Sequence, residues 1–350
     1  MTSQLLIEMP AQGAVRLLTL SLLEQIAQYT AGAAMGDPHD AWRYADTYRA
    51  FVRRLRASMS VYADALGESV PRKARRRVRD LVDAAERLHR ADVQAAWIGR
   101  HVATMGQREN DVPLGDGARA AAWLVDRLSR RRERARRLVQ RAQSDARPLR
   151  RISKRLGVYT TSVRLEEGPA HQSFAAMTSD HLLAKADALG AAIRTVTGPG
   201  SHAELRRARR AAEHIGYLLD PLRASTNIEE PSAHLARLRG ALDRLDDIEI
   251  VGRAIIRGGR RVAAVHAGQT LHDTIWPPAE SVLAPPMPPT PSNGRVLMSP
   301  TDLQRGLTVL AEALHDDAMH AFDALTAAWQ DSGADLFIDR LTTIATQLQD

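Results

Sequence analysis

The stretch "RAFVRRLRAS", residues 49–58, sets a row of arginines beside the apolar side of a predicted helix. At about 3.6 residues per turn, the apolar side of this helix is built from Tyr48, Phe51, Val52, Leu55, Met59 and Tyr62. Arg49, Arg53 and Arg56 recur at i, i+4 and i+7 and fall within an arc of about 80° beside the apolar side. Arg54 lies on the far side of the helix. Arginine stems pack against apolar surface while their guanidinium groups stay exposed, so we expect the row to line a groove.

A second predicted helix carries a similar row. It gathers His202, Arg206, Arg209, Arg210, Glu213 and Tyr217 on one side, within about 100°. An arginine at such spacing more commonly pairs with a carboxylate of a neighbouring helix, and for any single position that alternative is the stronger one. The two helices themselves hold few acids within these rows, Asp46 in the first and Glu213 in the second. We therefore expect the two rows to stay cationic and to face each other.

Helical periodicity of apolar residues extends from one end of the chain to the other. The predicted helices span residues 15–30, 38–66, 71–102, 118–147, 173–196, 201–222, 232–265 and 300–348. Start signals support them: residues 37–38 and 299–300 place Asp or Ser before Pro, and residues 201–204 form a capping-box motif. Alternation typical of strands is nearly absent, so the sequence predicts an all-α fold.

The two basic helices belong to an internal repeat. The pair Arg53-Arg54 is followed by Leu88 after 35 residues, and the pair Arg209-Arg210 is followed by Leu245 after 36 residues. Matched spacing in an all-helical chain favours a duplicated helical bundle. We predict a first helical half at residues 1–156, a connector at 157–172 and a second half at 173–350. The second half includes a proline-rich loop at 277–294.

Composition and charge narrow the class of partner. The chain has 350 residues and a net charge of +7, and only three of its 48 basic residues are lysine, which leaves 45 arginines. An arginine-rich basic protein favours a polyanion, because guanidinium groups bind phosphate oxygens bidentately. The chain has no cysteine, which excludes disulfides and thiolate chemistry, and no apolar run of the length that spans a bilayer. These features predict a soluble, cytoplasmic protein without a membrane partner.

The basic helices resemble those of a known family, the conserved histidine α-helical domain (CHAD). In "DTYRAFVRRLRA", Arg49, Arg53, Arg54 and Arg56 fall on the basic positions of the family. In "SHAELRRARR", His202 falls on the histidine position, and Arg209 and Arg210 fall on the paired basic positions. Two positions depart from the pattern: Asp46 stands where the first half has its histidine, and Leu205 replaces an arginine that Arg206 supplies one residue later.

The resemblance implies a fold and a ligand. It implies two four-helix-bundle-like halves related by pseudo-symmetry, with a basic groove between them that binds inorganic polyphosphate or another polyanion. It also implies an accessory protein associated with polyphosphate granules. The binding residues that we expect on this basis are Arg49, Arg53, Arg54, Arg56, His202, Arg206, Arg209 and Arg210.

A further basic run, "RLSRRRERARR" at residues 127–137, is the main rival patch. Its residues Arg127, Arg130, Arg134 and Arg137 share a helix face. Either they extend the groove, in which case Arg130, Arg134 and Arg137 join the binding residues, or they are a solvated helix surface. The sequence leaves both interpretations open.

Catalytic and metal-binding motifs are absent from the sequence. It contains no P-loop, no GxGxxG, no HExxH and no Glu-x-Glu-x-Lys, the motif of a hydrolase module that accompanies some members of the family. His315 and His320 lie five residues apart, which directs them to different faces of a helix. We therefore expect no enzyme activity, no metal and no cofactor. A nucleic-acid-binding protein is one alternative, although 15 aromatic residues provide little stacking surface. A helical scaffold that has lost anion binding is another, for which Asp46 is the best support.

Overall fold

The computed structural model of the chain describes residues 3–35, 41–108, 115–144, 147–162, 172–223, 228–275, 299–330 and 334–349. Nearly all of these residues are helical, and they contain no strand, only an isolated bridge between Pro10 and Ser173. The fold is therefore all-α, as the periodicity predicts.

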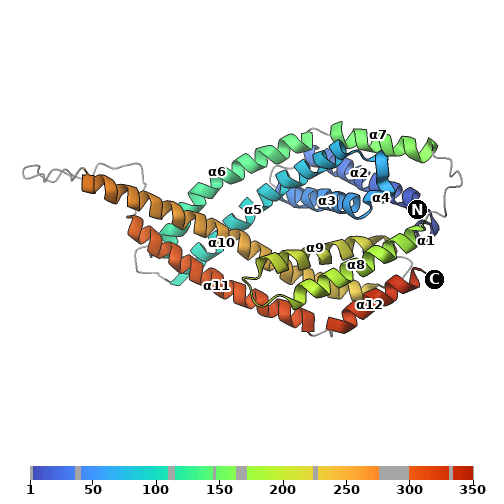
Figure 1. Cartoon of the computed structure of the whole chain (residues 1–350). Coiled ribbons are helices and arrows are strands. Elements are labelled where there is room, and N and C mark those ends of the chain that lie inside the picture. Colours follow the sequence, from blue (N-terminus) through green and yellow to red (C-terminus); the bar gives the residue numbers. More distant parts are fainter. Residues whose placement is uncertain are drawn as a thin grey trace, which may run out of the picture. The chain divides into compact units, whose positions relative to one another are not determined.

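Most helices overlap the predicted segments (Figure 1), but the helices at residues 3–8 and 147–162 were not predicted. They are α1 (Ser3–Glu8), α2 (Ala11–Met35), α3 (Ala41–Val61), α4 (Ala63–Leu66), α5 (Arg72–Arg108), α6 (Asp116–Ser144), α7 (Arg147–Ser162), α8 (Phe174–Arg194), α9 (His202–Leu219), α10 (Glu229–Ile275), α11 (Pro300–Gln330) and α12 (Ala334–Gln347), with 3-10 turns η2 (Gly67–Ser69) and η3 (Asp220–Leu222). The helix α7 continues to Ser162, so residues 157–162 of the expected connector are helical.

Two predicted helices are each represented by two helices in the structure. The segment 300–348 forms α11 and α12. The segment 38–66 becomes α3 and the short α4, which are separated at Tyr62. The chain then turns at Gly67, whose φ of 44° lies in a region that residues with a side chain rarely adopt. This turn sends the chain into α5.

The predicted helix starts have different outcomes. Ser299 caps α11, because its hydroxyl accepts from the backbone N–H of Asp302 at 3.1 Å. The expected capping box at Ser201 is wrong: its hydroxyl makes no cap hydrogen bond and accepts instead from the backbone N–H of Thr197 at 3.2 Å. The start signal at residues 37–38 and the proline-rich loop at 277–294 lie outside the described residues.

The chain divides into two compact units. Unit 1 comprises residues 1–90, 132–246 and 318–350, and unit 2 comprises residues 91–131 and 247–317. Unit 1 combines segments from both predicted halves, and the pseudo-symmetry of the halves stays a prediction. The core of unit 1 is mainly apolar: the fully buried side chains include those of Tyr48, Leu55, Leu66, Phe174, Leu182, Leu189, Ile215 and Phe337.

Unit 2 has an apolar core of its own. Its buried members include Trp97, Ile98, Leu124, Leu128, Val251, Ile255, Leu307 and Leu310. Two polar contacts fix its helices: the buried Gln94 donates to the backbone oxygen of Ile250 at 2.9 Å, and the indole N–H of Trp97 donates to the half-buried Asp317 at 2.7 Å. None of the helices in the described residues combines the length and the apolar character that a bilayer crossing requires.

The packing of unit 1 sets up the candidate site. The two helices with the basic rows, α3 and α9, contact each other, and α8 packs along α9. Apolar residues of these helices are buried between them, among them Val52 and Leu55 of α3 and Ala208 and Ala212 of α9. The rows that border these apolar sides are therefore brought into one region.

Candidate functional site

The arginines of α3 that lie nearest the core are paired with acids. A nitrogen of Arg53 lies 2.8 Å from Glu213 of α9 and another lies 3.5 Å from Glu86 of α5. Arg49 lies 3.7 Å from the same Glu86 and 3.8 Å from Asp46. The side chains of Arg53 and Glu213 are only 18% and 13% exposed. This pair is an internal crosslink between α3 and α9.

Arg209 of α9 is neutralised in the same way. Its Nε donates to Asp243 at 2.6 Å, and its Nη1 donates to Asp246 at 2.7 Å, both on α10. The sequence predicts Arg49, Arg53 and Arg209 as binding residues, and the structure brings them together but holds each beside carboxylates. We refer to these contacts of Arg49, Arg53 and Arg209 as the inner ion pairs. Their geometry matches the alternative in which an arginine of a basic row pairs with a carboxylate of a neighbouring helix.

The pKa values of Glu213 and Arg53 are shifted by the charges that the inner ion pairs bring together. Burial alone raises the pKa of Glu213, but the charge and hydrogen bond of Arg53, a hydrogen bond from Tyr217 and the charge of Arg209 together hold that pKa below its usual value. Burial lowers the pKa of Arg53, yet Glu213 and Glu86 more than compensate, so that pKa is raised. Both groups therefore stay charged at neutral pH, each stabilised by the other.

Arg54 and Asp46 each lie beside a group of opposite charge. Arg54 lies on the other side of α3 and pairs with Asp220 at 2.9 Å. Asp46, which occupies the family's first histidine position, is 60% exposed and lies 3.8 Å from both Arg49 and His89. Its carboxylate therefore adds one negative charge at the start of the basic row.

The cations at the other end of the two rows remain accessible. Arg56 of α3 and Arg210 of α9 are exposed, and both of their charges lower the pKa of His214. The largest cause of that lowered pKa is burial of the ring, followed by the charge of Lys185 on α8, while Glu213 opposes it. We call Arg56, Lys185, Arg210 and His214 the outer cluster. Its members come from α3, α8 and α9, and the charges of its three cations all act on the His214 ring.

Two further predicted residues lie close to the outer cluster in sequence. Arg206 and His202 are exposed in the first turns of α9. Arg206 donates to the backbone oxygen of His202 at 2.9 Å, and Arg210 donates to that of Arg206 at 3.2 Å. These backbone contacts hold the two guanidinium groups along one side of α9.

The rival patch lies on an exposed face of α6. Arg130 and Arg137 pair with Asp126 and Glu133 on the same helix, at 3.8 and 2.9 Å, and all four side chains are well exposed. Arg134 is exposed as well. Exposed pairs of this kind contribute little to stability. Both interpretations of the patch therefore stay predictions.

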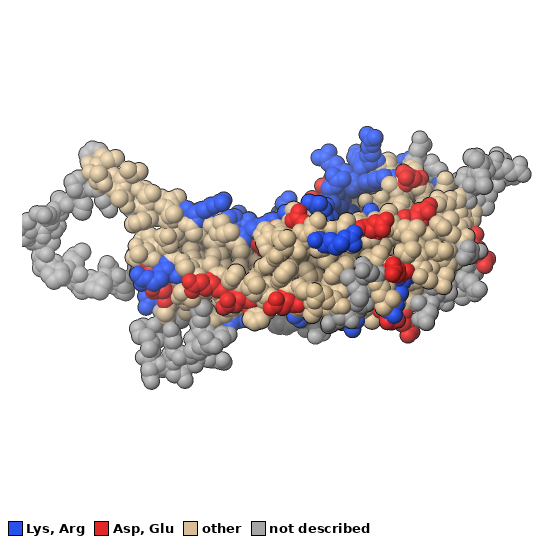
Figure 2. Space-filling model, turned by 60° about the horizontal axis from the view of Figure 1, so that its bottom comes forward, with Lys and Arg blue, Asp and Glu red and all other residues tan. Residues whose placement is uncertain are grey.

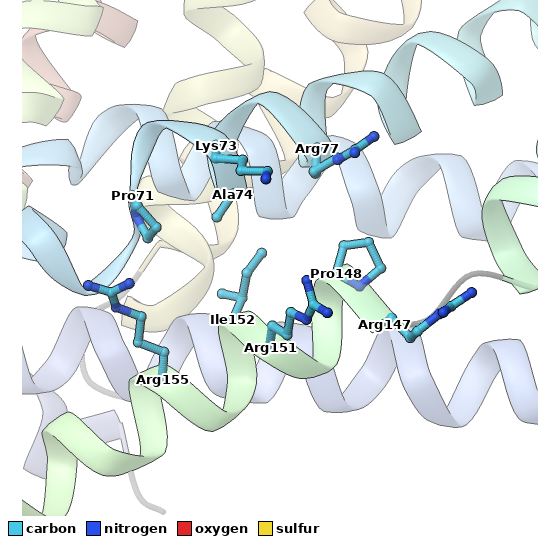
Figure 3. A pocket seen from close by; sticks show the side chains of 9 residues that line it. All are labelled: Pro71, Lys73, Ala74, Arg77, Arg147, Pro148, Arg151, Ile152 and Arg155. Carbon is cyan, nitrogen blue, oxygen red and sulfur yellow. The ribbon is translucent and has the colours of Figure 1, made fainter.

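A basic pocket that the sequence analysis missed lies between the first turns of α5 and α7. It has a volume of about 390 Å³, and its charged lining consists of Lys73, Arg77, Arg147, Arg151 and Arg155. Figure 3 shows Arg151 and Arg155 rising from α7 toward α5, and Lys73 extending above the same space. The available signal was the basic character of two helix starts, "RKARRR" and "RPLRR". Figure 2 shows that basic side chains gather densely on part of one face of the molecule.

Lys185 and His214 of the outer cluster were also missed. Lys185 lies on α8, which carries no basic row, and its proximity to α9 comes only from helix packing. Across the described part of the chain, three or more His, Asp or Glu side chains nowhere gather as metal ligands.

Comparisons with known proteins identify the fold. The structure is similar to that of PptA from Streptomyces chartreusis, with a TM-score of 0.62 and 15% identity over 92% of this chain and 99% of that chain. It is also similar to the CHAD domain from the plant Ricinus communis, with a TM-score of 0.53 and 16% identity over 97% of this chain and 92% of that chain. No curated protein sequence matches. The CHAD domain family model matches residues 19–255, about two thirds of the sequence, and the chain therefore belongs to the CHAD domain family.

Proposed function

We propose that this chain binds inorganic polyphosphate through the outer cluster, as an accessory protein of polyphosphate granules that acts by binding and not by catalysis. The observation that carries the proposal is that α9 contacts both α3 and α8, and that the charges of Arg56, Lys185 and Arg210 on these helices all act on His214. Among the described residues, none of these three cations has an acidic partner within ion-pair distance. Membership of the CHAD domain family supports the choice of ligand.

The physical chemistry of polyphosphate suits such a surface. The ligand is a flexible chain of phosphate units, so it requires an open row of cations and no enclosed cavity. Arg206 and His202 continue the row along α9. Binding of a polyanion releases its condensed counterions, which makes the affinity fall steeply as the salt concentration rises.

In this proposal the inner ion pairs have a structural role. Arg49, Arg53 and Arg209 already have carboxylate partners, and a phosphate chain would have to displace these acids. The pairs lock α3, α9 and α10 together and so position the outer cluster. The same neutralisation also favours the second candidate, a scaffold that has lost anion binding, and the experiment below separates the two.

The test is a double substitution, Arg56→Gln with Arg210→Gln, measured by the anisotropy of labelled long-chain polyphosphate over a series of salt concentrations. We expect the slope of log affinity against log salt to fall by about 0.7 for each lost phosphate contact, so by about 1.4 for the double variant. The matched control is Arg76→Gln with Arg79→Gln, two exposed arginines of α5. It should leave the slope unchanged.

Two outcomes contradict the proposal. If the wild-type chain does not bind polyphosphate near physiological salt, the scaffold interpretation holds. If duplex DNA of equal total charge displaces polyphosphate equally well, the chain is a general polyanion or nucleic-acid binder.

A further inference from the structure

We propose that the basic pocket between α5 and α7 is a second binding site, distinct from the outer cluster, for a nucleoside di- or triphosphate. It shares no residue with the outer cluster. Its volume of about 390 Å³ is in the range of pockets that hold small organic ligands. Binding of a nucleotide in this pocket is independent of polyphosphate binding elsewhere on the chain.

The first support is a conflict between charge and the helix dipole. Helix starts favour acidic side chains, because the unpaired backbone N–H groups of the first turn carry partial positive charge. Neither α5 nor α7 has an acid in its first turn. Instead Lys73 and Arg147 stand there, and both line the pocket. Two positive helix ends and basic side chains therefore point to the binding of an anion.

The second support is the shortage of neutralising acids. Arg77 has one partner, Asp80, at 3.9 Å, and both of these side chains are more than half exposed. For Lys73, Arg151 and Arg155, the described residues provide no acidic partner. Like charges that line one small space repel each other, and a bound phosphate group with about 1.5 to 2 negative charges would relieve that repulsion.

The third support is the apolar part of the lining, which selects the class of phosphate compound. Pro71 and Ala74 of the α5 start face Pro148 and Ile152 of α7 across the pocket (Figure 3). Ile152 is 3% exposed and forms the buried floor. Inorganic phosphate chains would gain nothing from these surfaces, whereas a nucleobase packs against proline and isoleucine. The cations would then bind the phosphate groups at the rim.

The experiment measures binding of ATP and ADP to the full chain by calorimetry. The test variant is Arg151→Gln with Arg155→Gln. The control is Arg150→Gln with Lys154→Gln, an equal loss of charge at the same spacing on the same helix, from side chains that line a different cavity. We expect ATP affinity to fall at least about tenfold in the test variant and to change less than about twofold in the control. Circular dichroism verifies that both variants remain helical.

Several results overturn the inference. The first is absence of ATP binding to the wild-type chain, and the second is an equal loss of ATP affinity in the control variant. The third is binding of inorganic tripolyphosphate in the pocket as tightly as ATP, which would show that the apolar walls do not contribute. The variant Arg56→Gln with Arg210→Gln separates the two proposals. It should retain ATP binding, and if ATP binding is lost together with polyphosphate binding, the two surfaces are one site.

Discussion

The most informative perturbation of the inner ion pairs is Arg53→Met, which retains most of the packed stem and removes the charge. It leaves Glu213 without the contact at 2.8 Å, and Glu213 is only 13% exposed. Removing one partner from a buried pair typically costs about 3 to 5 kcal/mol. Some exposure of both groups and the hydrogen bond that Tyr217 donates to Glu213 at 2.8 Å reduce that cost. We therefore expect the free energy of unfolding to fall by about 2 to 3 kcal/mol at neutral pH.

The pH dependence of this loss identifies its cause. In the wild-type chain the lowered pKa of Glu213 contributes stability above its unfolded pKa of 4.5, and this stability disappears as the pH falls through the folded pKa. Without Arg53, burial dominates and raises the pKa of Glu213, so the folded state is penalised at neutral pH and recovers on acidification. The stability difference between the two proteins should therefore shrink as the pH approaches about 4.5.

The assay is urea denaturation followed by circular dichroism, at several pH values, on a double-mutant cycle with Glu213→Gln. The double variant has neither charge, so we expect it to be more stable than the sum of the single losses predicts, by about 1 kcal/mol or more. If Arg53→Met changes stability by less than about 0.5 kcal/mol and abolishes polyphosphate binding, Arg53 is a ligand contact and the structural role is refuted.

One further prediction concerns a side chain of unit 1, and another concerns a side chain of unit 2. Burial and the neighbouring cations lower the pKa of His214, and bound polyphosphate should raise it. Polyphosphate affinity should then be higher at about pH 6 than at about pH 7.5. The variant His214→Gln should remove this difference in the same anisotropy assay. In unit 2, Asp317→Ala removes the acceptor of the Trp97 indole N–H. The free energy of unfolding should fall by about 1 to 2 kcal/mol, which a shift of the tryptophan fluorescence transition in urea would measure. An unchanged transition would contradict a stabilising role of this hydrogen bond.

The sequence was sufficient for most of the helices because their information is local, but it did not predict α7. Apolar periodicity locates each segment, and prolines or glycines interrupt it near the observed ends. The break between α3 and α4 was missed because apolar periodicity continues through Tyr62. The grouping of the chain into two units was not predicted either, since the long helices α5, α6, α10 and α11 each contribute residues to both units, and periodicity does not report where a packed core ends.

The candidate site was harder to predict, because periodicity places a side chain on its own helix and does not tell what lies opposite. The arc of Arg49, Arg53 and Arg56 in α3 was worked out without knowing that Glu86 of α5 faces its first two members. Counting acids only within the two basic helices made the rows seem more cationic than they are.

The internal repeat nevertheless contained the missing information. Glu86 stands two residues before Leu88, and Asp243 stands two residues before Leu245, the same two leucines that align the repeat. Each of these acids forms an ion pair with the first arginine of the Arg-Arg pair in the same half: Glu86 with Arg53, and Asp243 with Arg209. An acid that recurs at matched positions after a recurring arginine is therefore a sign of an internal ion pair. Where the repeat contains such an acid, the arginine of the basic row is better interpreted first as a structural residue. The ligand surface is then to be sought at cations for which the repeat contains no matching acid.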